Sequence, residues 1–316
     1  MKLSVVVAPT EDGLFLKGAF AALDAQEGAP PFEIVVPVDD SIHGVDGLRR
    51  AYPSIRFIDV PGTARLSSSC GIGVAHVAID RRRSAGLAAS RGEIVALTEE
   101  HARPASDWCA GIVDCHQAPH GVIGGAIENA TPRLVNWALY FLDAGRYQNP
   151  LPEGPSRFVS DVNVSYKRKH LESVRTLWEG MYHETGVHDA LRAAGETLWL
   201  TPKLVVRLDR GQVGLARALR ERFAWARLYA GRRSGEISRV TRFVYTIASP
   251  ILALILPVRA GKTSFTRKRH RVVFLKTLPL LLLMSSVWAM GEFTGYLTGR
   301  ATAGSAEAGS STATSA

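Results

Sequence analysis

The first 130 residues alternate short apolar runs with segments of helical periodicity. Apolar runs of strand length, bounded by turn residues, occur in LSVVVAP, FEIVVPVDD, IRFIDVPG, EIVALTEE and GVIGGAIENA. Helical periodicity falls between them, in GLFLKGAFAALDAQ, GVDGLRRAYP, HVAIDRRRSAGLAASRG and ASDWCAGIVDCHQ. Strands that are apolar throughout and separated by helices are typical of sheets covered on both faces. The pattern therefore predicts an α/β fold with a mostly parallel, Rossmann-like sheet flanked by helices.

Three of these predicted strands end in polar or acidic clusters. The clusters are Thr10–Asp12, Asp39 with Asp40, and Thr98–His101. Open parallel sheets bind their ligands outside the carboxyl ends of the strands. We therefore expect the three clusters to meet at one edge of the sheet and to line one crevice. A plain turn after the strand remains the alternative for Asp39 and Asp40, as does a solvated acidic turn for Thr98–His101.

The pattern becomes irregular over residues 131–202, where only a helix at 187–194 and a strand from 197 are predicted. A basic stretch with helical periodicity follows at 215–242, and it is amphipathic. We expect a domain at 1–210 and a second, helical region at 211–300. Residues 301–316 are Ala, Ser, Thr and Gly with one Glu, which is typical of a disordered tail.

Two uncharged apolar runs lie in the second region, at 243–258 and 277–291. Each is shorter than the roughly 20 residues needed to cross a bilayer. Lys and Arg number 19 against four Asp and Glu between Lys203 and Arg300, whereas the net charge of all 316 residues is only +9. Such polarised charge indicates a surface for anionic lipid or nucleic acid, and the apolar runs beside it favour lipid over nucleic acid.

The basic loop 259–271 carries six Lys and Arg and bears on how the two runs meet a membrane. If both runs crossed the bilayer, this loop would lie opposite the first domain, against the tendency of basic loops to stay in the cytoplasm. The amino-terminal apolar run is too short for a signal sequence, so the first domain is expected in the cytoplasm. We therefore predict a monotopic or re-entrant hairpin on the cytoplasmic side of an anionic membrane. A soluble helical hairpin and a two-span hairpin remain the alternatives.

The order of these features resembles the family-two glycosyltransferases, which have the nucleotide-sugar-binding GT-A fold. The resemblance covers residues 3–207 and is carried by SVVVAPTED, VVPVDDS, RRRSAGLAASRGEIVALTEEHARPASDW, a Gly pair at 124 and 125, VNVSYKR and YHETGVHDALRAAG. It implies a GT-A domain that transfers a sugar from a nucleotide donor, UDP-sugars being favoured, with inversion at the anomeric carbon. With the membrane prediction, it implies a lipid-linked or polysaccharide acceptor.

The resemblance also implies nucleotide-binding residues. Pro9, Thr10 and Glu11 match the loop that lines the base, and Asp39, followed by Asp40, matches the aspartate that hydrogen-bonds it. Arg83 matches the arginine of an R-N-x-G motif, which reads RSAG here, and is expected to help hold the diphosphate. A solvated helix face is the alternative for Arg82 and Arg83.

The metal and base positions depart from the family pattern. Thr98-Glu99-Glu100 stands where the family has Asp-x-Asp, so Glu100, helped by Glu99 or His101, is expected to hold Mg²⁺ or Mn²⁺. Glu184 falls at the catalytic-base position, with a helix-capping carboxylate as its alternative.

Histidine stands at position 183, where the family usually has an acid. His183 and His188 are each expected to be surface or packing residues rather than helpers of the base. Because Thr98 and His183 replace usual acids, a degenerate nucleotide-sugar-binding or scaffold subunit of a membrane assembly stays open beside the enzyme.

Overall fold

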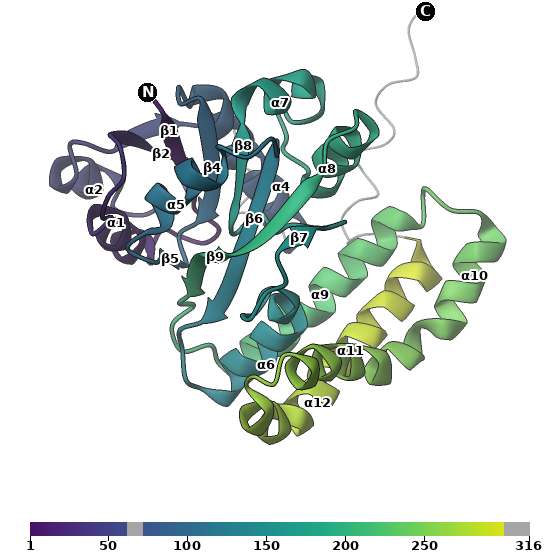
Figure 1. The fold of residues 1–316 in the computed structure, drawn as a ribbon. Coiled ribbons are helices and arrows are strands. Elements are labelled where there is room, and N and C mark those ends of the chain that lie inside the picture. Colours follow the sequence, from purple (N-terminus) through teal and green to yellow (C-terminus); the bar gives the residue numbers. More distant parts are fainter. Residues whose placement is uncertain (62–71, 300–316) are drawn as a thin grey trace, which may run out of the picture. The chain divides into compact units, whose positions relative to one another are not determined.

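The computed structural model describes residues 1–61 and 72–299 (Figure 1). The described chain forms two compact units. The first holds residues 1–61, 76–131 and 147–211, and the second holds 72–75, 132–146 and 212–299. The predicted tail, 301–316, lies outside the described residues.

The first unit is built on one mixed sheet of nine strands in the described ranges. The strands are β1 (Leu3–Ala8), β2 (Phe32–Val38), β3 (Arg56–Asp59), β4 (Ile94–Glu99), β5 (Ala102–Pro104), β6 (Val122–Asn129), β7 (Gly154–Pro155), β8 (Val164–Lys167) and β9 (Leu198–Leu208). Their order is β3-β2-β1-β4-β8-β6-β9-β5, with β7 paired to β9. The α/β prediction is confirmed, and β1 to β4 form a parallel half. Antiparallel β5, β7 and β8 make the remainder mixed, and the apolar pattern predicted none of the three.

Helices cover both faces of this sheet. They are α1 (Leu16–Asp24), α2 (Val45–Ala51), α4 (Ile72–Ala89), α5 (Trp108–Cys115), α7 (Arg168–Ser173) and α8 (Glu184–Ala193), with a 3₁₀ turn η2 (Arg175–Leu177). Helix α8 begins at Glu184, three residues before its predicted start. The prediction missed this first turn because it carries little apolar periodicity.

Strand β1 shows why the strands are apolar throughout. Val5 and Val7 belong to one core with Trp108 of α5, whereas Val6 belongs to a second core with Leu87 of α4. Successive side chains of a strand point to opposite faces, so a strand covered on both faces has no polar side.

The second unit consists of helices. They are α6 (Leu134–Asp143), α9 (Leu215–Arg233), α10 (Arg239–Ala248), α11 (Leu252–Thr266) and α12 (Arg271–Thr298), with 3₁₀ turns η1 (Gly145–Tyr147) and η3 (Ser249–Ile251) at segment ends. The basic stretch 215–242, expected to be helical, is divided between α9 and α10. The break is specified locally, because Ser238 caps α10 by accepting a hydrogen bond from the Thr241 amide at 3.1 Å.

The two apolar runs lie inside longer helical segments than the runs themselves suggested. Arg239–Thr266 and Arg271–Thr298 are each 28 residues long, and by length and composition each could cross a membrane. Charged residues at their ends had hidden this length, because helix continues through them while the apolar pattern stops.

Candidate active site

The three polar clusters do meet at one edge of the sheet. Ala8 at the end of β1 pairs with Glu99 at the end of β4, and β2 lies on the other side of β1. A backbone hydrogen bond of 3.0 Å, from the His43 amide to the Asp12 carbonyl, joins the loops after β2 and β1. The residues that follow these strands are therefore neighbours, as the strand pattern predicts.

Glu100 is fully buried and fixes the loop after β1. Its Oε1 accepts hydrogen bonds from the backbone amides of Thr10 at 2.9 Å and Glu11 at 2.6 Å. Its other oxygen, Oε2, is enclosed and lies within hydrogen-bonding distance of no donor in the described residues. The carboxylate therefore holds two amides of the loop expected to line the nucleotide base.

Asp39 is held by Arg82 rather than presented to solvent. Arg82 Nε lies 2.7 Å from Asp39 Oδ2, and the two side chains are 3% and 1% exposed. Arg82 also donates to the Pro9 carbonyl at 2.8 Å and to Ser41 Oγ at 2.7 Å. The alternative of a solvated helix face is wrong for Arg82. Its neighbour Asp40 is the exposed carboxylate of the pair.

Arg83 is buried among carboxylates, so a solvated helix face is wrong here too. Its guanidinium lies 2.6 Å from Glu99, 2.7 Å from Asp161 and 3.3 Å from Asp80. Burial alone would lower the pKa of Arg83, but the charges of Asp161 and Glu99 raise it, and it stays charged. Burial acts on the carboxylates in the direction opposite to its effect on Arg83. It raises the pKa of Asp80 to about 6 and also raises the pKa of Glu99.

Asp161 is a site residue that the sequence pattern missed. It lies just before β8, which runs antiparallel to β4 with Leu97 opposite Val164. The start of an antiparallel strand lies at the same edge as the ends of parallel strands. The segment is fixed there by a 2.8 Å hydrogen bond from Thr98 Oγ1 to the Val162 carbonyl. Recognising β8 in VNVSYKR was the signal that would have found Asp161.

Glu184 is the first residue of α8, directly after its cap residue His183. About a third of its side chain is exposed, 34%. Burial of the remainder, and then the negative charge of Asp161, raise the pKa of Glu184 well above its ordinary value. Glu184 therefore stands at a helix N-terminus, as the capping alternative expects, and also beside Asp161 at the candidate site.

A buried hydrogen-bonded group stands behind Glu184. His188 Nδ1 lies 3.9 Å from Glu184 Oε1, and His188 Nε2 lies 2.7 Å from the Tyr166 hydroxyl. Tyr166 in turn bonds the Tyr182 hydroxyl at 2.6 Å. Burial lowers the pKa of His188 to about 4, so its ring is neutral near pH 7. His188 is a packing residue, as expected, and it also faces the candidate base.

The three residues expected to hold a metal have different partners. Glu99 faces Arg83, Glu100 faces the loop amides, and His101 Nε2 lies 3.4 Å from Glu11 Oε1 with its ring against Phe15. Within residues 1–61 and 72–299, no three His, Cys, Asp or Glu side chains are grouped as metal ligands. Glu99, Glu100 and His101 therefore do not fit as a shared set for Mg²⁺ or Mn²⁺.

No protein-family model and no curated protein matches the sequence. Among solved structures, the chain is similar to the mannosyltransferase PcManGT from Pyrobaculum calidifontis in complex with GDP-Man and Mn²⁺. The identity is 17%, with 94% of this chain and 85% of that chain covered and a TM-score of 0.49. It is also similar to S. aureus TarS 1-349 in complex with UDP-GlcNAc, with 15% identity, 95% and 93% coverage and a TM-score of 0.46. Similarity at this level assigns no substrate, metal or residue role to this chain.

Proposed function

We propose that the chain is a membrane-associated glycosyltransferase that moves a sugar from a nucleoside diphosphate donor to a hydroxyl of a lipid-linked or polysaccharide acceptor. One observation carries this proposal. A partly exposed carboxyl, Glu184, has a raised pKa and stands at the strand-end edge beside Asp161 and Arg83. A general base for a hydroxyl works best when its pKa approaches the operating pH, and burial beside like charge brings a carboxyl toward that range.

In the proposed reaction, the acceptor oxygen attacks the anomeric carbon while Glu184 takes the hydroxyl proton. The bond from that carbon to the diphosphate breaks, and the configuration inverts. His188 is neutral, and its Nδ1 lies 3.9 Å from Glu184 Oε1, beyond hydrogen-bond distance, so it does not compete for the proton. The scaffold alternative keeps the binding of the donor and lacks the transfer step.

The donor is proposed to lie over the loop after β1, with a UDP-sugar favoured by the sequence resemblance. Pro9, Thr10 and Glu11 would line the base, and the loop is held for this purpose by Glu100 and Arg82. Asp40 is the carboxylate with exposure enough to reach a base, whereas Asp39 acts through Arg82. Arg83 is proposed to keep the charge of the acidic cluster low enough for a diphosphate to approach.

The packing of the second unit supports a membrane-facing role. All buried residues of α10, η3 and α11 are small residues or proline: Thr246, Ser249, Pro257, Ala260, Gly261 and Ser264. Their exposed side chains include large apolar ones: Val240, Phe243, Val244, Ile247, Ile251, Leu254, Ile255 and Val258. Small residues between helices and large apolar residues outside are typical of helices whose outer face contacts lipid. Arg239 and Arg242 lie at the start of α10, and six Lys and Arg lie over residues 259–271. These basic residues favour an anionic surface.

The close packing of α12 on α9 favours an in-plane position over a span. A Cβ on Gly291 would lie 2.5 Å from the Phe223 carbonyl, and one on Gly295 would lie 2.6 Å from the Arg227 carbonyl. Helix α9 therefore stays beside α12, and its arginines would enter the hydrocarbon if α12 crossed the bilayer. Because charged side chains there are costly, we propose a monotopic arrangement on the cytoplasmic side, where nucleotide sugars are available.

The test uses the full chain with UDP, GDP and dTDP, each with and without Mn²⁺, in a thermal-shift measurement. Incorporation of radiolabelled sugar from the matching nucleotide sugar into a lipid extract then reports transfer. Glu184→Gln should keep the nucleotide-dependent shift and lose incorporation by at least about a hundredfold, the usual contribution of a general base. Nucleotide binding without any incorporation by the wild type would favour the scaffold, and no shift with any nucleotide would contradict both.

A further inference from the structure

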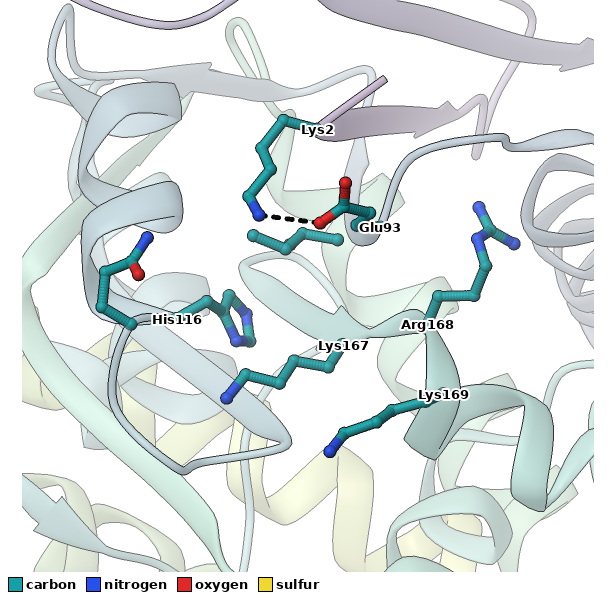
Figure 2. Close-up of a pocket in the computed structure, with 8 residues that line it drawn as sticks. Lys2, Glu93, His116, Lys167, Arg168 and Lys169 are labelled. Carbon is teal, nitrogen blue, oxygen red and sulfur yellow. Dashed lines mark hydrogen bonds and ion pairs between the residues drawn. The ribbon is translucent and has the colours of Figure 1, made fainter.

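A basic pocket lies at the sheet edge opposite the strand-end loops (Figure 2). It has a volume of about 470 Å³, within the range of small-molecule sites. Lys2 and Ile94 bring the starts of β1 and β4 to it, and Lys167 brings the end of antiparallel β8. The pocket shares no residue with the candidate active site.

Cations dominate the lining of this pocket. Lys2, Lys167, Arg168 and Lys169 contribute four positive charges, and Glu93 contributes the one carboxylate among its lining residues. Lys2 Nζ lies 2.7 Å from Glu93 Oε2, so this carboxylate is already engaged. Arg168 is paired with Glu172, which lies outside the lining, so Lys167 and Lys169 are the cations that leave the pocket with net positive charge.

Two of the cations are held by the fold. Lys167 Nζ donates to the Ala118 carbonyl at 2.6 Å, and Arg168 Nε donates to the Gly92 carbonyl at 2.6 Å. A neutral carbonyl fixes Lys167 without cancelling its charge, whereas Arg168 Nη1 also lies 3.5 Å from Glu172 Oε1. Figure 2 shows the side chains of Lys167 and Lys169 extending along the same side of the pocket. Burial and the neighbouring charge of Lys169 lower the pKa of Lys167, so an anion between them would relieve the repulsion.

The remaining lining suits an oxyanion. Gln117 supplies an amide donor, and His116 is buried with Nε2 2.9 Å from Ser165 Oγ. Burial lowers the pKa of His116 to about 4, so the histidine adds no charge near pH 7. Lysine ammonium groups bind phosphate as point charges without demanding one geometry.

We propose that this pocket binds a small phosphate-bearing anion between Lys167 and Lys169. The proposal goes beyond sugar transfer and does not depend on it. A phosphate dianion matches the net charge of the pocket better than a single carboxylate does, and the pocket volume admits a phosphate or diphosphate with a small attached group. The phosphate can belong to a soluble metabolite or to a lipid headgroup.

Isothermal titration calorimetry of the full chain with inorganic pyrophosphate, without divalent metal, tests this proposal. Wild type should bind one equivalent, and Lys169→Met should weaken binding by about tenfold, because a charged hydrogen-bonding partner is lost. Glu93→Gln should tighten binding, since it removes the one carboxylate of the lining. Lys17→Met is the matched control, because Lys17 is an exposed lysine of the same unit on α1, outside the pocket.

A second series separates the two sources of phosphate. Glycerol 3-phosphate and dihexanoyl phosphatidic acid, below its micelle concentration, carry the same phosphate without and with acyl chains. Tighter binding of the lipid, still weakened by Lys169→Met, would support a headgroup as ligand, and equal binding would support a soluble phosphate. Absence of saturable pyrophosphate binding, or equal weakening by Lys17→Met and Lys169→Met, would overturn the proposal.

Discussion

The guanidinium of Arg82 lies 2.7 Å from the carboxylate of Asp39, and both side chains are almost fully buried. The same guanidinium donates to the Pro9 carbonyl at 2.8 Å. One side chain of α4 therefore ties together the chain segments that leave β1 and β2. The loop expected to line the nucleotide base is thus set by a buried ion pair, before any ligand arrives.

Removing the charge of Asp39 should destabilise the fold. Asp39→Asn leaves the Arg82 cation buried without its carboxylate, and breaking a buried pair in this way costs about 3–5 kcal/mol. Urea unfolding would measure the change as a lower midpoint with an unchanged slope. Asp40→Asn is the control, because this exposed neighbour should change the free energy of unfolding by about 0.5 kcal/mol or less. Equal effects of the two substitutions would contradict the role given to Arg82.

Glu100 should also act through stability. Glu100→Ala removes the acceptor of the Thr10 and Glu11 amides, and hydrogen bonds to a charged group contribute about 1.5–3 kcal/mol each. We expect a loss of at least about 2 kcal/mol in urea unfolding without metal. If Glu100 were instead a metal ligand alone, Glu100→Gln would abolish a Mn²⁺-dependent thermal shift and leave metal-free stability unchanged. That outcome would restore the original expectation for this residue.

The apolar pattern predicted the parallel half of the fold because β1, β2 and β4 are buried on both faces and carry no polar side. It missed β8, because a four-residue strand with Ser165 and Lys167 has no such signature. Asp161 was lost with it, since its place at the strand-end edge follows from the antiparallel pairing of β8 with β4. A short strand is specified by its neighbours rather than by its own sequence.

The sequence predicted which residues belong to the candidate site better than it predicted the side chains that they contact. Arg83 and Glu184 were assigned to a site, and both stand at the strand-end edge. Their partners were not foreseen, because Asp80 and Asp161 approach Arg83 from α4 and from the segment before β8. Spacing along a chain can indicate that a carboxylate lies near a strand end. The direction in which its side chain points depends on the charged groups that neighbouring elements place there.

Transfer should depend on pH through Glu184. The pKa of this carboxyl is raised, so the base form appears only at pH values above those of an ordinary glutamate, and kcat/KM should rise with pH through the raised pKa. Asp161→Asn removes a charge that raises the pKa, so the acid limb of the pH profile should move to lower pH. Asp189→Asn, an exposed carboxylate on the same helix, should leave it in place. Equal shifts in the two variants would contradict the coupling between Asp161 and Glu184.

Folding stability should depend on pH through His188. The pKa of this buried ring falls from 6.5 to about 4, so between those values the unfolded chain binds more protons than the folded one. The stability that comes from keeping His188 neutral is fully present above pH 6.5 and is lost as the pH falls toward 4. The free energy of unfolding of wild type relative to His188→Gln should therefore fall by up to about 1.4 kcal/mol per pH unit in that window. Urea unfolding of both chains between pH 4.5 and 7.5 measures this difference, and parallel curves would contradict it.

Docking on a membrane should depend on the exposed apolar face of α10. Phe243 and Ile247 are 66% and 63% exposed and lie one turn apart on this helix. Burying a large apolar side chain in lipid stabilises binding by about 1.5–3 kcal/mol, so Phe243→Glu with Ile247→Glu should weaken vesicle binding by at least a factor of about one hundred. Flotation with phosphatidylglycerol vesicles measures the bound fraction. Adding 0.5 M NaCl should reduce it only in part, because a Debye length of roughly 4 Å at that salt screens the basic residues and does not weaken burial of the apolar face.

Leu14→Glu is the matched control for this docking, because Leu14 is 72% exposed and belongs to the first unit, not to the helices of the second. If it weakens flotation as much as the α10 pair does, the binding reflects added negative charge rather than the apolar face. An α10 variant that floats like wild type, with salt removing all binding, would mean that the basic residues alone hold the chain to the membrane. Loss of flotation confined to the α10 variant, with a folded first unit that still binds nucleotide, is the result expected if this face enters the lipid.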